Sequence, residues 1–255
     1  MRLRVLGCSG GYPTPESAST GYLLEEGETR IWLDAGNGTF SMLQRYADFR
    51  RLDAMVISHL HADHCLDIYP LYIALRYGEV KPAGRLPVYA APGTQEVLER
   101  MMDGEVGGKL EVTYDFHEVD EGDTVEIAGI RLSFLRMDHP GHTLGVRFES
   151  ATSSLTYSAD TGPKADLATF ARDTGLLLCE ATYQNARKGA PLHLSAEEAA
   201  QTARRAGAGE LVLTHHWPGL DPEISLSEAE AAAGGIPVHV ARPGAEFEVP
   251  AGRRR

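Results

Sequence analysis

Short apolar runs recur along the chain, each bounded by glycine, aspartate or proline. Runs rich in β-branched and aliphatic residues between such breakers are typical of strands. In the first half we expect strands at Leu3–Gly7, Gly21–Leu24, Arg30–Leu33, Ala54–Ile57 and Pro87–Ala90. In the second half the expected strands are Leu110–Phe116, Thr124–Ile127, Arg131–Met137, Leu144–Phe148, Ser154–Tyr157, Leu176–Leu178, Leu211–Leu213 and Val238–Ala241.

Other segments carry apolar residues at the three- and four-residue spacing of an α-helix. One of them has clear bounds at both ends. Ser195 and Glu198 stand at the spacing of a capping box before it, and Gly207 is a natural residue to end it. The expected helices are Thr39–Tyr46, Leu66–Arg76, Thr94–Met102, Pro163–Phe170 and Ala196–Ala206.

The predicted strands come in clusters, with helices distributed between them in both halves of the chain. Strands that are apolar along their whole length need to be covered on both faces of their sheet. This order predicts an α/β fold in which two mixed sheets lie face to face with helices outside each, a four-layer αββα sandwich. Candidate site residues occur in both halves, which meet near residues 125–130. We therefore expect a single domain over residues 1–255.

Charge and cysteine usage narrow the function classes. The formal net charge is −12, which argues against a broad contact with nucleic acid, because such contacts need Lys and Arg beside the phosphates. Cys8, Cys65 and Cys179 form no C-x-x-C pair, and their odd number argues against a disulfide framework. The N-terminal segment has no secretory hydrophobic region, and no apolar run reaches the length of a membrane span. We expect a cytoplasmic protein.

The densest group of chemistry-bearing residues follows the strand predicted at 54–57. His59, His61, Asp63 and His64 occur within the sequence Ser-His-Leu-His-Ala-Asp-His-Cys. On an extended turn the first two imidazoles point to one side, and the aspartate and third histidine follow at the start of the next helix. Such a loop can hold two cations, each with its own subset of ligands. A polar loop with capping residues is the alternative, but it does not account for this density.

His-x-His-x-Asp-His at the end of a strand is the signature of the metallo-β-lactamase superfamily, which the chain resembles over residues 3 to about 220. Asp34, in Leu-Asp-Ala-Gly-Asn-Gly, matches the family's early strand-end aspartate. His139, before a proline and six residues ahead of a glycine, is similar to the next metal histidine of the ribonuclease Z-like branch. Asp160, in Tyr-Ser-Ala-Asp-Thr-Gly, matches the aspartate that bridges both metals. His215, in Leu-Thr-His, matches the last ligand.

The resemblance implies two bound divalent metal ions, Zn²⁺ in the first place, with Mn²⁺ or Fe²⁺ as alternatives. Two cations lower the pKa of a bridging water enough to form hydroxide at neutral pH, and they offset charge on the attacked group. Asp34 is expected to orient a ligand histidine from behind, with a helix N-cap as the alternative role. The implied ligands are His59, His61 and His139 for one ion, Asp63, His64 and His215 for the other, and Asp160 for both.

Two further histidines stand close to expected ligands. His142 lies three residues after His139 and competes with it as a ligand, although the spacing to the following glycine favours His139. His142 remains a candidate for contact with substrate. His216 follows His215 directly and is expected to point elsewhere, because neighbouring side chains of an extended chain alternate in direction.

His193 stands just before the helix predicted at 196–206 and after the segment Cys-Glu-Ala-Thr-Tyr. In the ribonuclease Z-like branch a histidine in this context is implicated in proton donation. The resemblance carries that role to His193, with Glu180 as its orienting partner. The departing alkoxide of a phosphodiester needs a proton, which an imidazole can give near pH 7. A capping or packing histidine is the alternative. Asp63 and His193 are the expected catalytic residues.

The length of one connection distinguishes between branches of the superfamily. Ribonuclease Z resembles this sequence in all motifs but carries a long arm that grips transfer RNA between its third and fourth motifs. Only residues 140–159 separate His139 from Asp160 here, enough for two strands and a turn. The chain is therefore most similar to small, arm-less members of the branch, some of which hydrolyse cyclic nucleotides. The glycine-rich segment 7–11 is expected at the rim of the metal site, either near a phosphate or as a tight turn.

From this resemblance we expect a dinuclear metal-dependent phosphodiesterase that acts on a small phosphodiester, such as a cyclic nucleotide, through a metal-bridging hydroxide. The alternatives are a ribonuclease Z-type endoribonuclease for transfer RNA 3′ ends, and a lactonase or ester hydrolase on the same metals. A binding protein on a decayed site is the third alternative, and the intact ligand positions argue against it. A homodimer is expected from the resemblance; nucleic acid and membrane are not expected partners.

Overall fold

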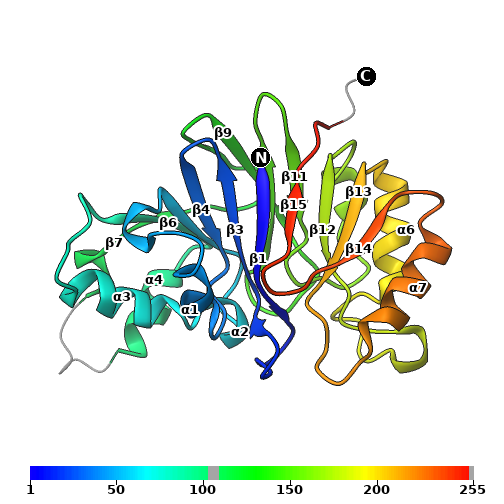
Figure 1. Cartoon of the computed structure of the whole chain (residues 1–255), viewed down its shortest axis with the longest axis horizontal. Helices are drawn as coiled ribbons and strands as arrows, with labels where there is room; N and C mark the ends of the chain where they lie inside the picture. The colour runs from blue at the N-terminus through cyan, green and yellow to red at the C-terminus, as the bar shows by residue number, and fades with distance from the viewer. Residues whose placement is uncertain (103–108, 253–255) are drawn as a thin grey trace.

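Two mixed β-sheets lie face to face at the centre of this computed structural model, which describes residues 1–102 and 109–252 (Figure 1). The spatial order of the first sheet is β15 (Glu246–Glu248), β1 (Arg2–Ser9), β3 (Gly21–Glu26), β4 (Thr29–Leu33), β5 (Ala54–Ile57), β6 (Leu86–Ala90) and β7 (Tyr114–Glu118), with β2 (Ala18–Ser19) beside β1. The order of the second is β14 (Val238–Val240), β13 (Glu210–Thr214), β12 (Leu176–Glu180), β11 (Ser154–Tyr157), β10 (Leu144–Glu149), β9 (Ile130–Arg136) and β8 (Thr124–Ile127).

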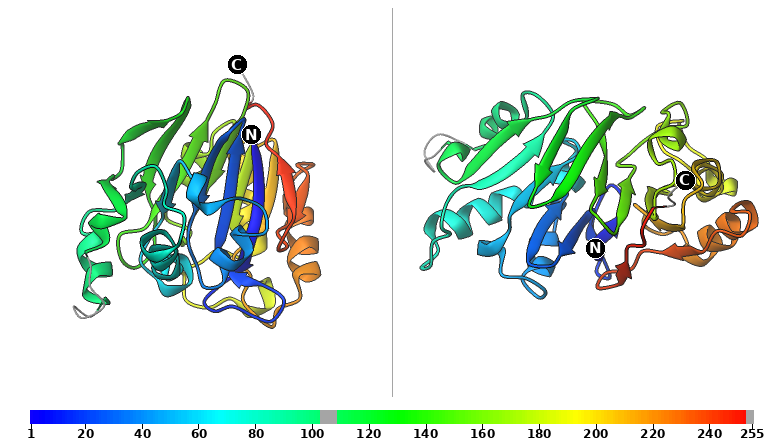
Figure 2. Two further views of the ribbon diagram at one scale, coloured as in Figure 1. Left: turned by 60° about the vertical axis from the view of Figure 1, so that its left-hand side comes forward. Right: turned by 90° about the horizontal axis from the view of Figure 1, so that it is seen from above.

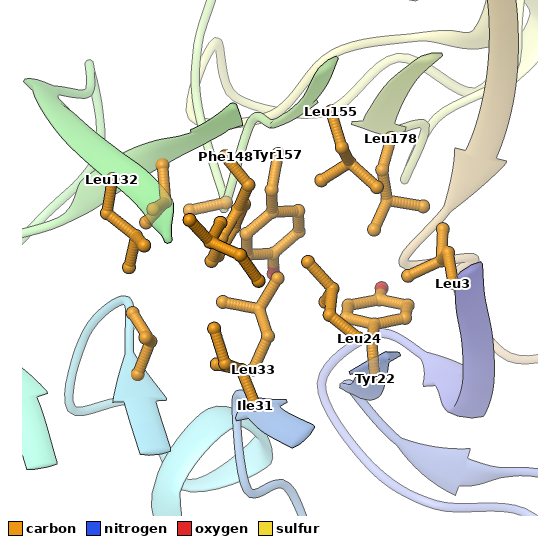
Figure 3. Packing of buried hydrophobic residues seen from close by; sticks show 14 of the residues in the cluster. Leu3, Tyr22, Leu24, Ile31, Leu33, Leu132, Phe148, Leu155, Tyr157 and Leu178 are labelled. Carbon is orange, nitrogen blue, oxygen red and sulfur yellow. The ribbon is translucent and has the colours of Figure 1, made fainter. Parts of the chain in front are cut away.

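Each sheet is buried on both faces because successive side chains of a strand point to opposite sides. In β4, Ile31 and Leu33 face the other sheet, whereas Trp32 faces the outer helices. β12 follows the same alternation with its run of leucines. Figure 3 shows apolar side chains of both sheets meeting between them, among them Leu3, Tyr22, Leu132, Phe148 and Leu178. These runs are therefore apolar throughout because both of their faces lie in a core.

Helices cover the outer face of each sheet (Figures 1 and 2). The first sheet is covered by α1 (Thr39–Leu43), α3 (Ile68–Tyr77) and α4 (Thr94–Arg100). The second is covered by α5 (Leu167–Phe170), α6 (Ala196–Ala206) and α7 (Pro222–Ala232). The predicted αββα sandwich is confirmed. Short helical turns lie in the connections: η1 (Phe49–Arg51), α2 (Ala62–Cys65), η2 (Leu110–Val112) and η3 (Asn185–Arg187).

The prediction of a helix at Leu66–Arg76 is wrong at its start. Leu66 and Asp67 lie in a break between α2 and α3, and α3 begins at Ile68. The backbone N–H of Asp67 donates to the carbonyl of Ala35 at 2.7 Å instead of continuing a helix. The Asp67 carboxylate in turn accepts the backbone N–H of Phe40 at 2.7 Å. These contacts tie the segment after the histidine motif to the segment after β4. A tertiary contact, which helical periodicity does not report, sets the break.

The strand expected at Leu110–Phe116 is also wrong in its first half. The N–H of Thr113 bonds back to Leu110 at 2.9 Å, so the segment turns before β7 begins at Tyr114. The helix expected at Pro163–Phe170 is confined to α5, which Asp166 caps. The sequence patterns missed α7, whose apolar residues follow no clear helical period, and the short charged edge strand β15.

The core between the sheets contains residues from both halves of the chain, from Leu3 in β1 to Val249 beyond β15. A single domain over residues 1–255 stays a prediction, and this shared core supports it. In the described residues, no helix has both the length and the apolar character needed to cross a membrane.

Candidate metal centre

The candidate site residues come together at one end of the two sheets, where several strands end. Asp34 follows β4, His59 follows β5, and His215 follows β13. Carboxyl ends of neighbouring parallel strands meet at one edge, where open α/β sheets bind ligands. Asp34, Ala159 and His215 have φ angles of 54°, 50° and 55°. Such left-handed conformations are uncommon outside glycine and cluster at functional sites.

Two groups of ligand-type side chains form the centre. Within each group, the ligand atoms contributed by the residues all lie within 4.8 Å of one another. The first group is His59, His61, His139 and Asp160, and the second is Asp63, His64 and His215. The structure therefore brings the seven expected ligands together in the division that the resemblance implied. Their role as ligands stays a prediction.

Asp160 lies between the two groups. Its Oδ2 atom is 3.6 Å from Nε2 of His59 and 3.6 Å from Nε2 of His139. Its Oδ1 atom is 3.3 Å from Nε2 of His64 and 3.4 Å from Nε2 of His215. Each carboxylate oxygen therefore faces the imidazoles of a different group. A carboxylate in this position can bridge two cations, one through each oxygen.

Two buried atoms of the centre fit a bound ion. Nε2 of His64 and Oδ1 of Asp160 are buried and make no hydrogen bond with any residue in the described parts of the chain. Unpaired polar atoms in a protein interior are costly, and an ion is one of the partners that account for them. Imidazole and carboxylate are the donors that Zn²⁺ and related divalent cations take. The residues present therefore fit divalent metal ions.

Asp34 holds one of these histidines from behind. Its Oδ2 atom is 2.8 Å from Nδ1 of His64, which leaves Nε2 of that ring for the centre. Asp34 also accepts the backbone N–H of Ser58 at 2.7 Å and the hydroxyl of Tyr157 at 2.8 Å. The alternative of a helix N-cap is excluded, because the N-cap of α1 is Gly38. Asp34 lies where an orienting carboxylate is needed.

Other ring nitrogens have supporting partners that the sequence analysis missed. The Thr182 hydroxyl lies 2.8 Å from Nδ1 of His215, and the Leu192 carbonyl lies 2.9 Å from Nδ1 of His139. A carbonyl carries no sequence signal, since every residue has one. Thr182 was visible only as part of the Glu-Ala-Thr segment. Such partners set which nitrogen of each ring faces a metal.

Burial and neighbouring charges shift the pKa values of the residues in the centre in different directions. Burial lowers the pKa of His59 well below its usual value, and the neighbouring His64 lowers it further. Burial also disfavours a charge on His64, but Asp160 and Asp34 outweigh it and raise the pKa of that imidazole well above its usual value. Burial alone would raise the pKa of Asp160, yet His215 and His64 hold it well below the usual range. An ionised carboxylate and a neutral imidazole at His59 are the forms that bind metal.

The structure places the two histidines that stand close to expected ligands in the sequence, His142 and His216, outside the two groups. His139 lies in the first group, with Nε2 3.2 Å from Nδ1 of His61. His142 points away, with Nε2 2.8 Å from Oδ1 of Asp120. His216 lies outside both groups, and burial lowers its pKa to about 4.

This arrangement gives a direct test of the ligand set. We expect His139→Ala to lower the metal content at saturation, because it removes a donor from the first group. His142→Ala is the matched control and should keep the wild-type metal content, since its ring contacts a surface carboxylate. Metal analysis after dialysis measures both. Full metal content in His139→Ala together with a loss in His142→Ala would contradict this assignment.

Glu180 holds His193 against the centre. Its carboxylate lies 3.0 Å from Nδ1 of His193 and accepts the backbone N–H of Leu194 at 3.2 Å. It also accepts the backbone N–H of Thr161 at 2.6 Å and the hydroxyl of Thr182 at 2.7 Å. Glu180 is fully buried at the end of β12. The expected pairing of Glu180 with His193 is present in the structure.

His193 also lies against two of the expected ligands. Its ring stacks on that of His215 with centroids 5.3 Å apart, and it is 4.9 Å from the ring of His139. A third group of ligand-type atoms joins His193 to Asp160 and His215. Burial disfavours a charge on this ring, but the hydrogen bond and charge of Glu180 outweigh it and raise the pKa of His193. An imidazole that carries a proton beside the centre can act as an acid.

Comparison with known proteins identifies the family. A family model described as a β-lactamase superfamily domain matches residues 29–216. The chain belongs to this superfamily. A protein of Bacillus subtilis, YhfI, named as a probable metallo-hydrolase, is 32% identical over 84% of this chain and 86% of its own length. The crystal structure of that metallo-β-lactamase fold protein superposes with a TM-score of 0.87, at 27% identity, over 97% of this chain and 99% of that chain.

Two further relatives match this chain along most of their own length. An uncharacterised protein of Mycobacterium leprae is 36% identical over 100% of this chain and 90% of its own length. A ribonuclease Z of a Mycobacterium species is 29% identical over 93% of this chain and 91% of its own length. The resemblance to the ribonuclease Z-like branch is therefore confirmed. The chain is a metallo-hydrolase of the metallo-β-lactamase fold, with a histidine and aspartate cluster suited to divalent metal ions.

Proposed function

We propose that this metallo-hydrolase is a dinuclear phosphodiesterase that acts on a small phosphodiester such as a cyclic nucleotide. The observation that carries the proposal is His193, held by Glu180 beside both groups of ligand-type residues. A phosphodiester has an alkoxide leaving group, which needs a proton donor more than the leaving group of an activated ester does. Zn²⁺ is the proposed metal, and a homodimer is the proposed assembly.

Two divalent cations, when bound, would supply an activated water and positive charge to offset that on the attacked group. The chain itself supplies the proton. Because Nδ1 of His193 bonds to Glu180, Nε2 is the nitrogen left to give a proton to the leaving ribose oxygen as its bond to phosphorus breaks. The Glu180 carboxylate stabilises the imidazolium before that transfer. The carboxylate of Asp63 accepts the backbone N–H of Gly11 at 2.6 Å and lies 3.2 Å from Nε2 of His215.

The connection between His139 and Asp160 supports a small substrate. β10 and β11 take up half of residues 140–159 and pair as an antiparallel hairpin within the second sheet. A long arm for gripping RNA has no place in this connection, which lies wholly within the described residues. The relative named ribonuclease Z cleaves RNA, as its name states, which supports phosphodiester chemistry on this fold. The net charge of −12 argues against a large nucleic acid.

A substrate panel tests the proposal. The purified protein, loaded with Zn²⁺ or with Mn²⁺, is assayed on 2′,3′- and 3′,5′-cyclic nucleotides, bis(p-nitrophenyl) phosphate, a lactone and precursor transfer RNA. We expect hydrolysis of at least one cyclic nucleotide, with much lower kcat/KM on the lactone. A lactone hydrolysed faster than every phosphodiester would replace this proposal by an ester hydrolase.

The relative named ribonuclease Z makes precursor transfer RNA an alternative substrate to test. We expect no efficient 3′ processing, since residues 140–159 hold a short hairpin of the second sheet and not an arm, and since the chain is acidic. Denaturing gels of a labelled precursor measure the cleavage. Specific cleavage at micromolar substrate or below would make a ribonuclease Z-type endoribonuclease the better supported function.

A further inference from the structure

Two exposed aromatic side chains stand at the rim of the metal centre. Tyr12 is 50% exposed and Trp217 is 45% exposed. Their rings meet edge to face, with centroids 6.1 Å apart and planes at 89°. The loops that carry them lie at the lower edge of Figure 1, where β1 and β13 end. We refer to Tyr12 and Trp217 together as the aromatic corner.

The aromatic corner is tied to the metal centre from both sides. Gly11, next to Tyr12, donates its backbone N–H to the carboxylate of Asp63 at 2.6 Å. Trp217 follows His215 by two residues, and His216 between them forms a bridge with Ser9. A Cβ atom at Gly10 would lie 2.7 Å from Nδ1 of His215, so that imidazole packs on the residue next to Gly11.

Gly11 brings the indole close to that centre. A Cβ atom at Gly11 would lie 3.1 Å from Cζ3 of Trp217, so the ring packs directly on this part of the backbone. The φ of Gly11 is +77°, which favours glycine. The same residue therefore lets the indole pack on the backbone and holds Asp63 through its N–H.

Packing within the chain does not account for the aromatic corner. The other tryptophan, Trp32, is completely buried beneath α1, where it stacks with Phe40. Trp217 and Tyr12 contact each other but leave about half of their surface in water, beside a cluster of histidines and carboxylates. Flat apolar faces next to a polar reaction centre are suited to a ligand that is aromatic at one end and charged at the other.

We propose that the aromatic corner binds the base of a nucleoside phosphodiester by stacking while its phosphate lies at the metal centre. The inference rests on the proposed phosphodiesterase function and names its substrate class, base-containing and not base-free. Trp217 is two residues from His215, so their Cα atoms are at most about 7.6 Å apart, which places the aromatic corner close to the second group of ligand-type residues.

Steady-state kinetics on a matched pair of substrates tests the inference. The pair is a 3′,5′-cyclic nucleotide and the 3′,5′-cyclic phosphate of 1-O-methyl ribose, which lacks the base. We expect Trp217→Ala and Tyr12→Ala to raise KM for the nucleotide about 5- to 150-fold, the range for loss of one stacking ring, with little change in kcat. KM for the base-free substrate should stay unchanged. Trp217→Phe and Tyr12→Phe should restore most of the nucleotide affinity.

Tyr77→Ala is the matched control, because Tyr77 is a similarly exposed aromatic residue at the end of α3, outside the centre. It should change neither KM. Equal changes in KM on both substrates in the corner variants would overturn the inference while leaving the phosphodiesterase function intact. The inference would also be overturned if the wild type hydrolysed both substrates with the same KM and the corner variants changed neither KM.

Intrinsic tryptophan fluorescence tests whether the aromatic corner binds a base, even if the protein hydrolyses no phosphodiester. Trp217 is the tryptophan that a ligand can reach, since the chain has two and Trp32 is buried. We expect adenosine 5′-monophosphate to quench the emission in a saturable way and ribose 5-phosphate not to. Trp217→Phe should abolish the quenching, and Tyr12→Ala should weaken it. Equal quenching by both phosphates, or none by either, would overturn the inference.

Discussion

Asp160→Ala is expected to abolish phosphodiester hydrolysis and to lower the metal content from two ions per chain. The two oxygens of this carboxylate face different groups of histidines, at 3.3–3.6 Å, so no other residue of the centre occupies an equivalent position between the groups. In two-metal sites the ions lie roughly 3.5–4 Å apart, a separation that one bridging carboxylate can span. The loss should exceed the roughly 10- to 100-fold typical of residues that only support metal ligands.

The measurement combines metal analysis, turnover of the best substrate in the panel, and circular dichroism. Asp160 belongs to the centre and not to the apolar core, so the variant should stay folded. Asp115→Ala, at a partly exposed carboxylate on β7, is the matched control and should keep both metal ions and activity. A variant that keeps two ions, or more than about a tenth of wild-type turnover (the smallest loss above), would show that Asp160 does not bridge.

His193→Ala is expected to lower turnover of a phosphodiester with a poor leaving group by about 10²- to 10⁴-fold, the usual range for general acid catalysis. The reason is the proton that Nε2 can give while Glu180 holds Nδ1 at 3.0 Å. An activated substrate with a p-nitrophenolate leaving group needs much less protonation. The same variant should therefore lose far less activity on that substrate.

This contrast separates a proton donor from a residue that only supports the site. His142→Ala is the control, because it removes an imidazole that contacts Asp120 and lies outside the metal centre. Metal content should be unchanged in both variants. Equal losses on the two substrates, or no loss on either, would remove His193 as the acid. An ester hydrolase or lactonase would then be as well supported as a phosphodiesterase.

Local sequence patterns are enough to predict the layers of this protein and the place of its reaction centre. Strand runs that are apolar throughout, such as Leu176–Leu178, can only lie where both faces are covered, and the structure places them between a second sheet and helices. The motif from His59 to His64 is dense enough to predict metal chemistry without coordinates. Both signals are local, because they depend on spacing along a few residues of chain.

The contacts between groups that are distant in the sequence depend on the folded chain. The Asp67 N–H bonds to Ala35, so α3 begins at Ile68 and not at Leu66 as the periodicity predicts. The fold also sets which of His139 and His142 lies in the cluster, because the first ring lies among the ligand-type residues and the second contacts Asp120. These outcomes depend on how strand ends are brought to one edge of the sandwich, which no local pattern encodes.

The aromatic corner is the clearest case of such dependence. Tyr12 and Trp217 are 205 positions apart in the sequence, and neither stands in a motif that predicts binding. They meet because the end of β1 pairs with the residue after His215, through the bridge between Ser9 and His216. Long-range pairing of this kind depends on the register of the whole fold, so the sequence supplied the two rings and the folded chain placed them beside the metal centre.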